Sequence, residues 1–342
     1  MSFWKSFSKL EMPQPQEKLY GIQEIYSPPG LIEPEVEFLP KHIKNARVLV
    51  WGYNADYTSL NGGFPSKDRV HHHAHTLVAN LAADRRLSGT ADKPIIFLCH
   101  SLGGIIVKRA LTYAQTRTAH KVSHDYSIFS CTYGILFFGT PHHGSSPATY
   151  ANYLQNLGHL TTAGKMSKSD LIKALETESE TLQNITDFFV PIMRNFHIYF
   201  FWEQLPTPLP GRLGSMYIVK SESAAPTFDD TERAAIAADH REMVRFESPR
   251  SQGFRLVMDA LLRYCEGAPD VIRHRCVDAA RTLGLERNRV AAETLRIAPH
   301  FSAGVDMMGL TGLAGLDGFT IVDQSGKFRS IVRAPDDAKA EV

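Results

Sequence analysis

Cysteine is scarce in this sequence, and neither sign of charge is in excess. The 342 residues include four cysteines without a Cys-x-x-Cys spacing, and 37 Lys and Arg residues balance 36 Asp and Glu residues. A formal net charge of +1 creates no field that would favour nucleic acid or an anionic membrane. Scattered cysteines favour buried free thiols in a reducing compartment. We therefore expect a cytoplasmic protein that binds no nucleic acid.

Long apolar runs and cofactor motifs are missing as well. No stretch of 18 apolar residues is present, so no transmembrane segment is predicted. The first ten residues, MSFWKSFSKL, are too polar to be the apolar region of a secretory signal. The glycine-rich segment GLTGLAGLDGF lacks the Gly-Lys-Ser/Thr of a phosphate-binding loop. We therefore expect no signal peptide and no cofactor, and we interpret this segment as a loop or a mobile tail.

A metal site is not favoured either, although one histidine run has a suggestive spacing. The segment HHHAH places His71 and His75 four residues apart, so that both could hold one metal ion on a helix. No intervening glutamate and no third ligand is evident. A solvated helix end is the favoured interpretation, and we expect no metal.

What the sequence does contain is an alternation of short apolar segments and amphipathic ones. Strands are predicted at 46–53, 94–100, 133–139, 196–203 and 215–222, and helices at 67–87, 103–117, 147–190 and 240–264. Strands that alternate with helices form parallel sheets covered on both faces, so an α/β fold is predicted. We expect three parts: an N-terminal extension (1–45), an α/β domain (46–266) with a helical cap insertion (about 147–190), and a helical or irregular tail (267–342).

One segment, FLCHSLGGIIVKRAL, places a serine between a predicted strand and a predicted helix. The pattern strand, x-Ser-x-Gly, helix is the nucleophile elbow of an α/β-hydrolase, whose tight turn exposes the serine hydroxyl. Gly103 lies two residues after Ser101, and Gly104 would let the helix pack close to the strand. Cys99 stands where the elbow usually has a glycine, and it is small enough for the turn. The N–H of Leu102 would point at a developing oxyanion at the helix N-terminus.

A serine hydroxyl needs a base within hydrogen-bond reach, and the base needs an orienting acid. In this fold the chain order is serine, acid, histidine. His240, in AADHREM, stands after the last predicted strand and is the predicted base. Glu203, at the end of YFFWE, is the predicted acid, and Glu222, at the end of the following predicted strand, is its rival.

Other side chains are candidates for the substrate pocket. His100 directly precedes the serine, and His142 and His143 lie in the turn TPHHGSS, where a purely structural role in the turn fits equally well. The predicted cap carries apolar and aromatic residues at helical spacing: Tyr150, Tyr153, Leu154 and Leu157. They would suit an apolar acyl chain, with Tyr150 at the pocket, but packing of the cap on the sheet is the favoured interpretation.

Taken together, the segments FLCHSLGGIIVKRAL, GILFFGTPHHGS, FWEQLPT and AADHREMVRF resemble one branch of the α/β-hydrolases. This branch includes the serine active site-containing protein and, more distantly, the GPI inositol-deacylases and lipase-like proteins. The likeness extends in particular to fungal hydrolase domains found with NLR-like proteins, and it covers residues 19–265. The resemblance implies an α/β-hydrolase fold, a nucleophile on Ser101 and a base on His240, with Glu203 as the acid that fits best.

The chain departs from this family before the strand predicted at 46–53. Similar proteins carry a strand that ends in a His-Gly-rich loop, whereas here GIQEIYSPPG runs directly into LIEPEVEFLPKHI. We therefore expect that this strand and its glycine loop, which supplies the second oxyanion donor, are absent. Either the oxyanion hole is incomplete or Gly30 and its neighbours replace the loop. The loss of one donor costs about 100- to 1000-fold in turnover.

These observations predict a serine hydrolase of the esterase, lipase or thioesterase kind, which acts on an acyl ester or thioester through an acyl-enzyme. One alternative is acyl release from an acyl carrier protein, or lactone formation, in fungal secondary metabolism. A basic patch for such an acidic carrier could come from Lys108, Arg109, Arg117 and Lys121, although solvated helix charges explain these residues as well. The other alternative is a catalytically weak or inactive interaction or signalling domain. The acyl substrate and the oligomeric state are not predicted.

Overall fold

The computed structural model describes residues 21–26, 42–43, 45–53, 67–142, 153, 156, 182–209, 214–297, 319–322 and 328–331. The chain forms two compact units, Met1–Arg287 and Asn288–Val342. The second unit contains an antiparallel hairpin of β9 (Phe319–Val322) and β10 (Phe328–Ile331). The first unit contains the main sheet and the site described below. The predicted boundaries at 45/46 and 266/267 stay predictions.

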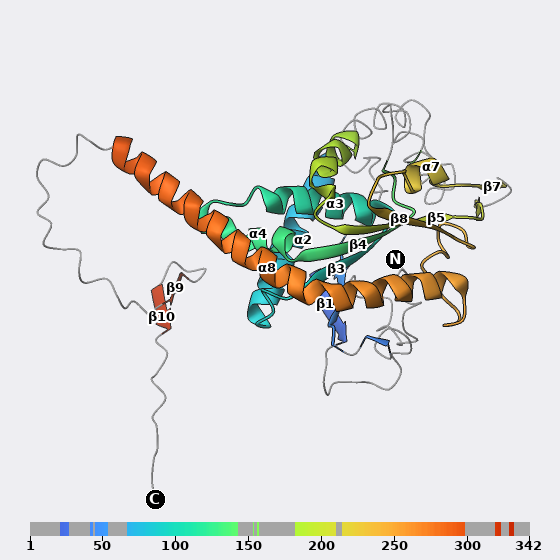
Figure 1. The fold of residues 1–342 in the computed structure, drawn as a ribbon, viewed down its shortest axis with the longest axis horizontal. Helices are drawn as coiled ribbons and strands as arrows, with labels where there is room; N and C mark the ends of the chain where they lie inside the picture. The colour runs from blue at the N-terminus through green and yellow to red at the C-terminus, as the bar shows by residue number, and fades with distance from the viewer. Residues whose placement is uncertain are drawn as a thin grey trace, which may run out of the picture. The chain divides into compact units, whose positions relative to one another are not determined.

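The main sheet consists of four parallel strands in the order β3-β4-β5-β8 (Figure 1). These strands are β3 (Ile95–His100), β4 (Thr132–Phe138), β5 (His197–Glu203) and β8 (Thr231–Ile236). All seven residues of β4 are buried, which explains its continuous apolar sequence, because a central parallel strand is covered on both faces. All four strands end at the same edge of the sheet, and this edge carries the site.

Helices cover both faces of this sheet. The helix α3 (Leu102–Gln115) lies against Phe137, because a Cβ on Gly104 would come within 2.9 Å of the Phe137 ring. The long helix α8 (Gln252–Ile297) lies against Gly134, where a Cβ would come within 2.4 Å of the Tyr264 ring. Gly134 and Phe137 are an odd number of positions apart on β4, so they face opposite sides of the sheet. Figure 1 shows α8 crossing one face. The predicted α/β-hydrolase fold, with helices on both faces of a mostly parallel sheet, is confirmed.

Further helices pack beside α3. The helix α2 (Lys67–Leu87) contacts both α3 and α4 (Ser123–Ser130), and a short 3-10 helix, His120–Val122, precedes α4. The predicted helix at 67–87 coincides with α2. Its buried positions, Val70, Ala74, Leu77, Val78 and Leu81, follow the spacing of one helix face.

A further strand precedes the one at 46–53, which was expected to begin the domain. The segment GIQEIY forms β1 (Gly21–Tyr26), which pairs antiparallel with β2 (Val48–Gly52). The prediction that the strand before 46–53 is absent is therefore wrong; the segment is short, and Gln23 and Glu24 interrupt its apolar residues. The residues at 27–41, which include Gly30, lie outside the described residues.

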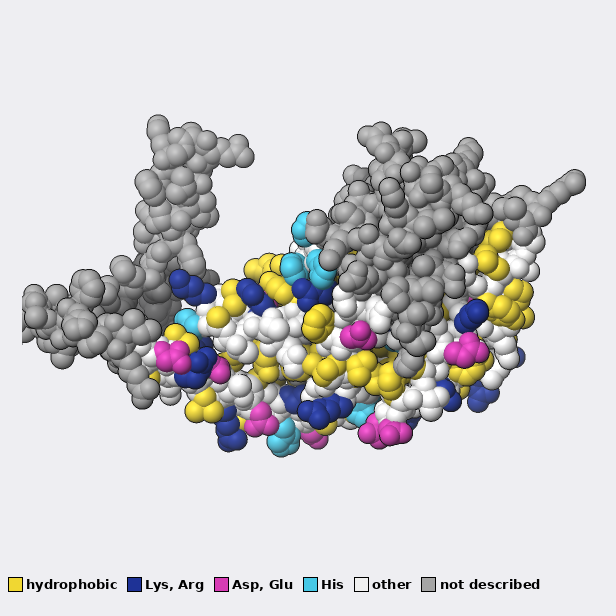
Figure 2. Space-filling model, turned by 90° about the horizontal axis from the view of Figure 1, so that it is seen from above, with side chains coloured by type: hydrophobic (Ala, Val, Ile, Leu, Met, Phe, Trp, Pro, Cys, Tyr) yellow, Lys and Arg dark blue, Asp and Glu magenta, His cyan; other side chains and the backbone are white. Residues whose placement is uncertain are grey.

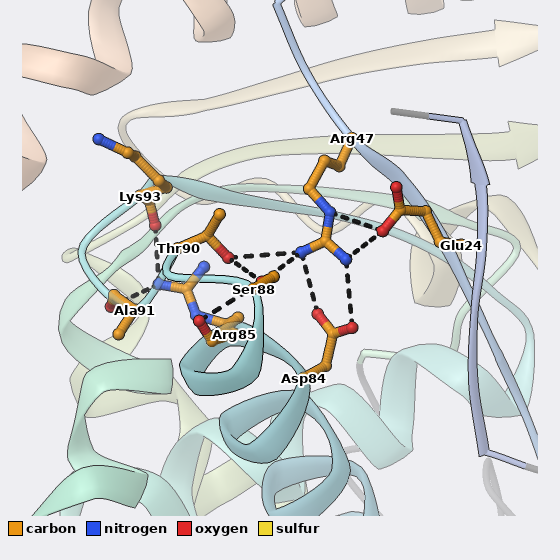
Figure 3. A network of polar contacts seen from close by, with 8 residues as sticks. All are labelled: Glu24, Arg47, Asp84, Arg85, Ser88, Thr90, Ala91 and Lys93. Carbon is orange, nitrogen blue, oxygen red and sulfur yellow. Dashed lines mark hydrogen bonds and ion pairs between the residues drawn. The ribbon is translucent and has the colours of Figure 1, made fainter. Parts of the chain in front are cut away.

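A partly buried arginine ties this strand pair to α2 (Figure 3). The Arg47 guanidinium donates to the carboxylates of Glu24 on β1 and Asp84 on α2, and to the hydroxyl of Ser88 at 2.9 Å. The two carboxylates outweigh the desolvation of the partly buried guanidinium and raise the pKa of Arg47. Because these groups are partly exposed, we expect a modest contribution to stability and a defined angle between β2 and α2.

One predicted strand was wrong, and another strand was missed. The segment 215–222 holds only β7 (Ser215–Met216), which pairs with β6 (Thr207–Pro208), and the short helix α7 (Ser221–Ala224). The fourth parallel strand is β8, which was missed because it begins with the polar sequence Thr-Glu-Arg at the edge of the sheet.

The last helix begins later and ends later than predicted. Pro249 disfavours helical backbone at the residue before it, and residues 241–251 form turns and irregular backbone. The Ser251 hydroxyl accepts a hydrogen bond from the Phe254 N–H at 3.4 Å and so caps the start of α8. Within the described part of the chain, no helix combines the length and the apolarity needed to cross a bilayer.

Candidate active site

Ser101 stands alone in the turn between β3 and α3. Its backbone has φ 55° and ψ −125°, a conformation that residues other than glycine rarely adopt. The N–H of Ser101 donates to the Phe138 carbonyl at 2.9 Å, and its carbonyl accepts from the Thr140 hydroxyl at 3.0 Å. These two bonds from the end of β4 hold the strained turn in place and direct the side chain to the strand ends.

The two glycines after the serine have different roles in this turn. A Cβ on Gly104 would lie 2.3 Å from the Thr140 hydroxyl oxygen, so the close approach of α3 to β4 needs a glycine there, as predicted. A Cβ on Gly103 would meet nothing within 4 Å, so no described neighbour requires a glycine at that position. Cys99 is buried on β3, and burial raises the pKa of its thiol, which keeps it protonated.

His240 follows β8 and lies beside the serine. Its Nε2 is 3.0 Å from the Ser101 Oγ, and both residues are buried. The His240 N–H donates to the Thr207 hydroxyl at 3.0 Å, which fixes the backbone that carries the imidazole. Gly139 makes room for the ring, because a Cβ there would lie 2.8 Å from the His240 Cε1 and Nδ1 atoms. The positive φ of 52° at Gly139 also favours glycine.

Glu203, the last residue of β5, lies on the other side of this imidazole. Its Oε2 is 3.1 Å from the His240 Nδ1, a distance typical of an ion pair, although the ring N–H is not aimed along the line that joins the two atoms. Such loose alignment is common in sites without substrate. The other carboxylate oxygen, Oε1, accepts the Val219 N–H at 2.9 Å. The carboxylate therefore favours a proton on Nδ1 and leaves the Nε2 lone pair for the serine.

The rival acid is not at this position. Glu222 lies exposed in the first turn of α7, whereas the carboxylate beside the imidazole belongs to Glu203. The structure thus brings together Ser101, Glu203 and His240 from three different strand ends.

Two predicted pocket histidines have contacts of another kind. The His100 Nε2 donates to the His240 carbonyl at 2.7 Å, and the two rings lie 4.8 Å apart. Burial, together with the neighbouring His240, lowers the pKa of His100 to about 3, so this ring is neutral and supports the backbone of His240. The His142 ring packs against Phe137 and Phe200 in the core. The predicted pocket residues His143 and Tyr150 lie outside the described residues.

One contact of the serine was missed by sequence reasoning. The Tyr153 hydroxyl is 3.0 Å from the Ser101 Oγ, and Tyr153 is only 3% exposed. Burial raises the pKa of this phenol. The apolar spacing of the predicted cap did single out Tyr153, but it favoured packing on the sheet. Nothing in the local pattern distinguishes a packed tyrosine from one whose hydroxyl reaches the nucleophile.

The elbow also provides a backbone donor next to the serine. Leu102 is the first residue of α3, and helix geometry leaves its N–H without an acceptor inside the helix. This N–H and the partial positive charge of the helix N-terminus would both stabilise negative charge near Ser101. The second predicted donor, Gly30, lies outside the described residues.

The predicted basic patch loses one of its members. Lys108 is fully buried, and its Nζ donates to the Pro141 carbonyl at 3.0 Å and to the Thr186 hydroxyl at 3.2 Å. Burial lowers the pKa of Lys108 to about 7. On the face shown in Figure 2, basic and acidic side chains are interspersed. Lys108 therefore cannot contribute to a surface for an acidic partner.

The histidine run on α2 is engaged in other contacts. The His71 Nδ1 accepts a hydrogen bond from the Arg109 Nε at 2.6 Å, and the His75 ring lies 4.0 Å from the Tyr113 ring. Burial lowers the pKa of His75. Across the described ranges, no group of three His, Cys, Asp or Glu side chains is arranged to hold a metal ion.

Part of the chain is similar in sequence to part of several known proteins. No family model matches the chain. Over 141 residues it is 31% identical to Protein SERAC1 of Homo sapiens, which covers 41% of this chain and 19% of that protein. Protein SERAC1 of Danio rerio is 28% identical over 210 residues, which covers 61% of this chain and 29% of that protein. The chain thus spans less than a third of the length of these relatives.

One solved structure is also similar. The mature Bacillus licheniformis lipase BlEst2 matches 56% of this chain and 74% of that chain, with a TM-score of 0.34 and 18% identity. The SERAC1 matches support the predicted resemblance to the serine active site-containing branch of the α/β-hydrolases. The more particular likeness to fungal, NLR-associated domains stays a prediction.

Proposed function

We propose that this protein is a serine hydrolase that cleaves an acyl ester or thioester through an acyl-enzyme on Ser101. The observation that carries the proposal is the buried chain of polar groups in which the Ser101 Oγ, the His240 imidazole and the Glu203 carboxylate follow one another at 3.0 and 3.1 Å. The partial likeness to the SERAC1 proteins adds support for a hydrolase of the lipase-like kind.

In the proposed acylation, the Ser101 Oγ attacks the acyl carbon while its proton passes to the His240 Nε2. The carbonyl electrons move onto the substrate oxygen, which becomes an oxyanion beside the Leu102 N–H. When the tetrahedral intermediate collapses, the bond to the alcohol or thiol breaks, and the imidazolium returns its proton to this leaving group. Glu203 stabilises the transient charge on the imidazolium.

In the proposed deacylation, water replaces the serine as the nucleophile. Its oxygen bonds to the acyl carbon, and its proton passes to the His240 Nε2. The bond between the acyl carbon and the Ser101 Oγ then breaks, and the imidazolium returns the proton to the serine. The products are a carboxylic acid and the free enzyme. A hydroxyl of the acyl chain could take the place of water, which would give a lactone.

The geometry favours an enzyme over an interaction domain. Ser101 adopts a strained backbone conformation, and Glu203 is a buried carboxylate with no Lys or Arg side chain among its described partners. Strain and buried charge each cost free energy, and such costs concentrate at functional sites. A domain that serves only as a binding surface has no need of them. The carrier-protein alternative draws less support from the predicted basic patch, because Lys108, one of its four members, is buried.

The test is covalent labelling by a fluorophosphonate probe, read by intact mass. The native protein should gain one adduct, and Ser101→Ala should gain none. Ser130→Ala is the matched control, because Ser130 is also buried but lies at the end of α4. A folded native protein that gains no adduct, or Ser101→Ala labelled like the native protein, would contradict the proposal and favour the interaction domain.

A further inference from the structure

The nucleophile elbow provides only one donor to the oxyanion hole of this site. That donor is the N–H of Leu102, at the start of α3. α/β-hydrolases usually take a second backbone donor from a loop that follows an early strand. In this chain the connection between β1 and β2, residues 27–47, contains a single glycine, Gly30. A glycine-rich loop of the usual kind is therefore missing from the sequence at this point.

Tyr153 places a hydroxyl where such a donor would be useful. Its oxygen is 3.0 Å from the Ser101 Oγ, and the side chain is almost completely buried. The direction of the hydrogen bond follows from the neighbouring groups. Glu203 favours a proton on the His240 Nδ1, so Nε2 accepts the single proton of the Ser101 hydroxyl. The Ser101 Oγ must then accept, and the Tyr153 O–H must donate, in the contact between them.

The phenol is also suited to remain a donor. Burial raises the pKa of Tyr153, while the hydrogen bond to Ser101 opposes that shift and the nearby Tyr53 and Glu203 add to it. A tyrosine held in its neutral form keeps its proton for hydrogen bonding over the whole range in which a histidine base works. A fixed O–H donor in a site with little water stabilises developing negative charge strongly.

We propose that Tyr153 is a catalytic residue that supplies the second oxyanion donor, in place of the missing glycine loop. This inference rests on the proposed function. When the Ser101 Oγ bonds to the acyl carbon, its proton goes to His240 and the substrate oxygen gains the carbonyl electron pair. The serine oxygen and the oxyanion are then bonded to the same carbon. The Tyr153 O–H needs only a small rotation to pass from one to the other, and it transfers no proton.

The experiment compares Tyr153→Phe with the native protein on p-nitrophenyl butyrate. Because the variant keeps the aromatic ring and loses only the hydroxyl, we expect kcat to fall about 100-fold while KM changes little. Tyr199→Phe is the matched control, because Tyr199 is also buried but lies on β5 away from the elbow, and its kcat should stay within about twofold of the native value. Urea unfolding of all three proteins checks that they fold.

A second measurement separates an oxyanion donor from a residue that only holds the serine. An alkyl trifluoromethyl ketone forms a hemiketal with the serine, and the hemiketal oxygen mimics the oxyanion. Its affinity should fall in Tyr153→Phe by about the same factor as kcat. An unchanged affinity, with or without a loss of kcat, would overturn the inference while leaving the hydrolase proposal intact. A native protein that neither turns over the ester nor gains a fluorophosphonate adduct would contradict both the hydrolase proposal and the role of Tyr153.

Discussion

Replacing Gly139 by alanine would test whether the position of the imidazole over this residue controls the reactivity of Ser101. The added Cβ would lie 2.8 Å from two atoms of the His240 ring and 3.1 Å from the Met243 sulfur. Ordinary contacts begin near 3.4 Å, so the ring must move by about 0.6 Å. Such a movement disturbs both the 3.0 Å contact with Ser101 and the contact with Glu203.

The expected magnitudes separate stability from catalysis. A side chain at a positive φ costs about 1 to 2 kcal/mol, part of which is offset because alanine restricts the unfolded chain. The displacement of a catalytic group by about 1 Å costs about 100-fold in rate, so a shift of this size should lower kcat by about 10- to 100-fold. Gly89→Ala is the matched control, because Gly89 has a φ of 68° and a Cβ there meets nothing within 4 Å.

Two assays on the same samples read out these effects. Urea unfolding should show a loss of stability of about 1 kcal/mol in Gly89→Ala, and a larger loss in Gly139→Ala, whose Cβ also crowds the buried His240 ring. The rate of labelling by the fluorophosphonate, and ester turnover, should fall only in Gly139→Ala. If Gly139→Ala is folded and reacts as fast as Gly89→Ala, the imidazole of His240 does not control the reactivity of Ser101, and the proposed mechanism is refuted.

Further substitutions test other parts of the site and the fold. Glu203→Gln should lower ester turnover by about 1000-fold or more, because a neutral amide cannot stabilise the imidazolium, whereas Glu222→Gln should leave turnover unchanged. Gly104→Ala should lower the free energy of urea unfolding by about 1 to 3 kcal/mol through overpacking, whereas Gly103→Ala should be neutral or slightly stabilising; equal effects of the pair would contradict the packing of α3. Burial lowers the pKa of Lys108 to about 7 from an ordinary value of 10.5, so between these pH values the unfolded chain binds more protons than the native protein. Native stability should therefore rise from pH 7 to pH 10.5, and Lys108→Met should remove this part of the slope in urea unfolding; parallel profiles of the two proteins would contradict it.

The grouping of three site residues could be predicted because each one lies at the end of a strand or after it. Ser101, Glu203 and His240 stand directly after apolar segments or beyond the last strand, and the carboxyl ends of parallel strands meet at one edge of a sheet. The strained turn at Ser101 also has a local signature, since strand, serine, glycines and helix stand in sequence. Local pattern and chain order were thus sufficient to find the edge that carries the site.

Other features depend on packing that no local pattern records. The strand β8 is polar at its start, since it forms the edge of the sheet, and the more apolar segment 215–222 was taken in its place. Lys108 was expected at the surface because lysine usually lies there, but Pro141 and Thr186 close over it. Tyr153 reaches Ser101 from a segment 52 residues away, so its hydroxyl contact follows from tertiary structure alone.

The separation of the site residues along the chain has a consequence for how the protein folds. Ser101 and His240 are 139 residues apart, and they meet only after β3, β4, β5 and β8 have all paired in register. Parallel pairings between distant segments form slowly, because the chain must lose the entropy of closing long loops first. A slip of one residue in any strand would turn its side chains to the opposite face. The reactivity of one serine therefore reports, during refolding, the moment at which the whole sheet is complete.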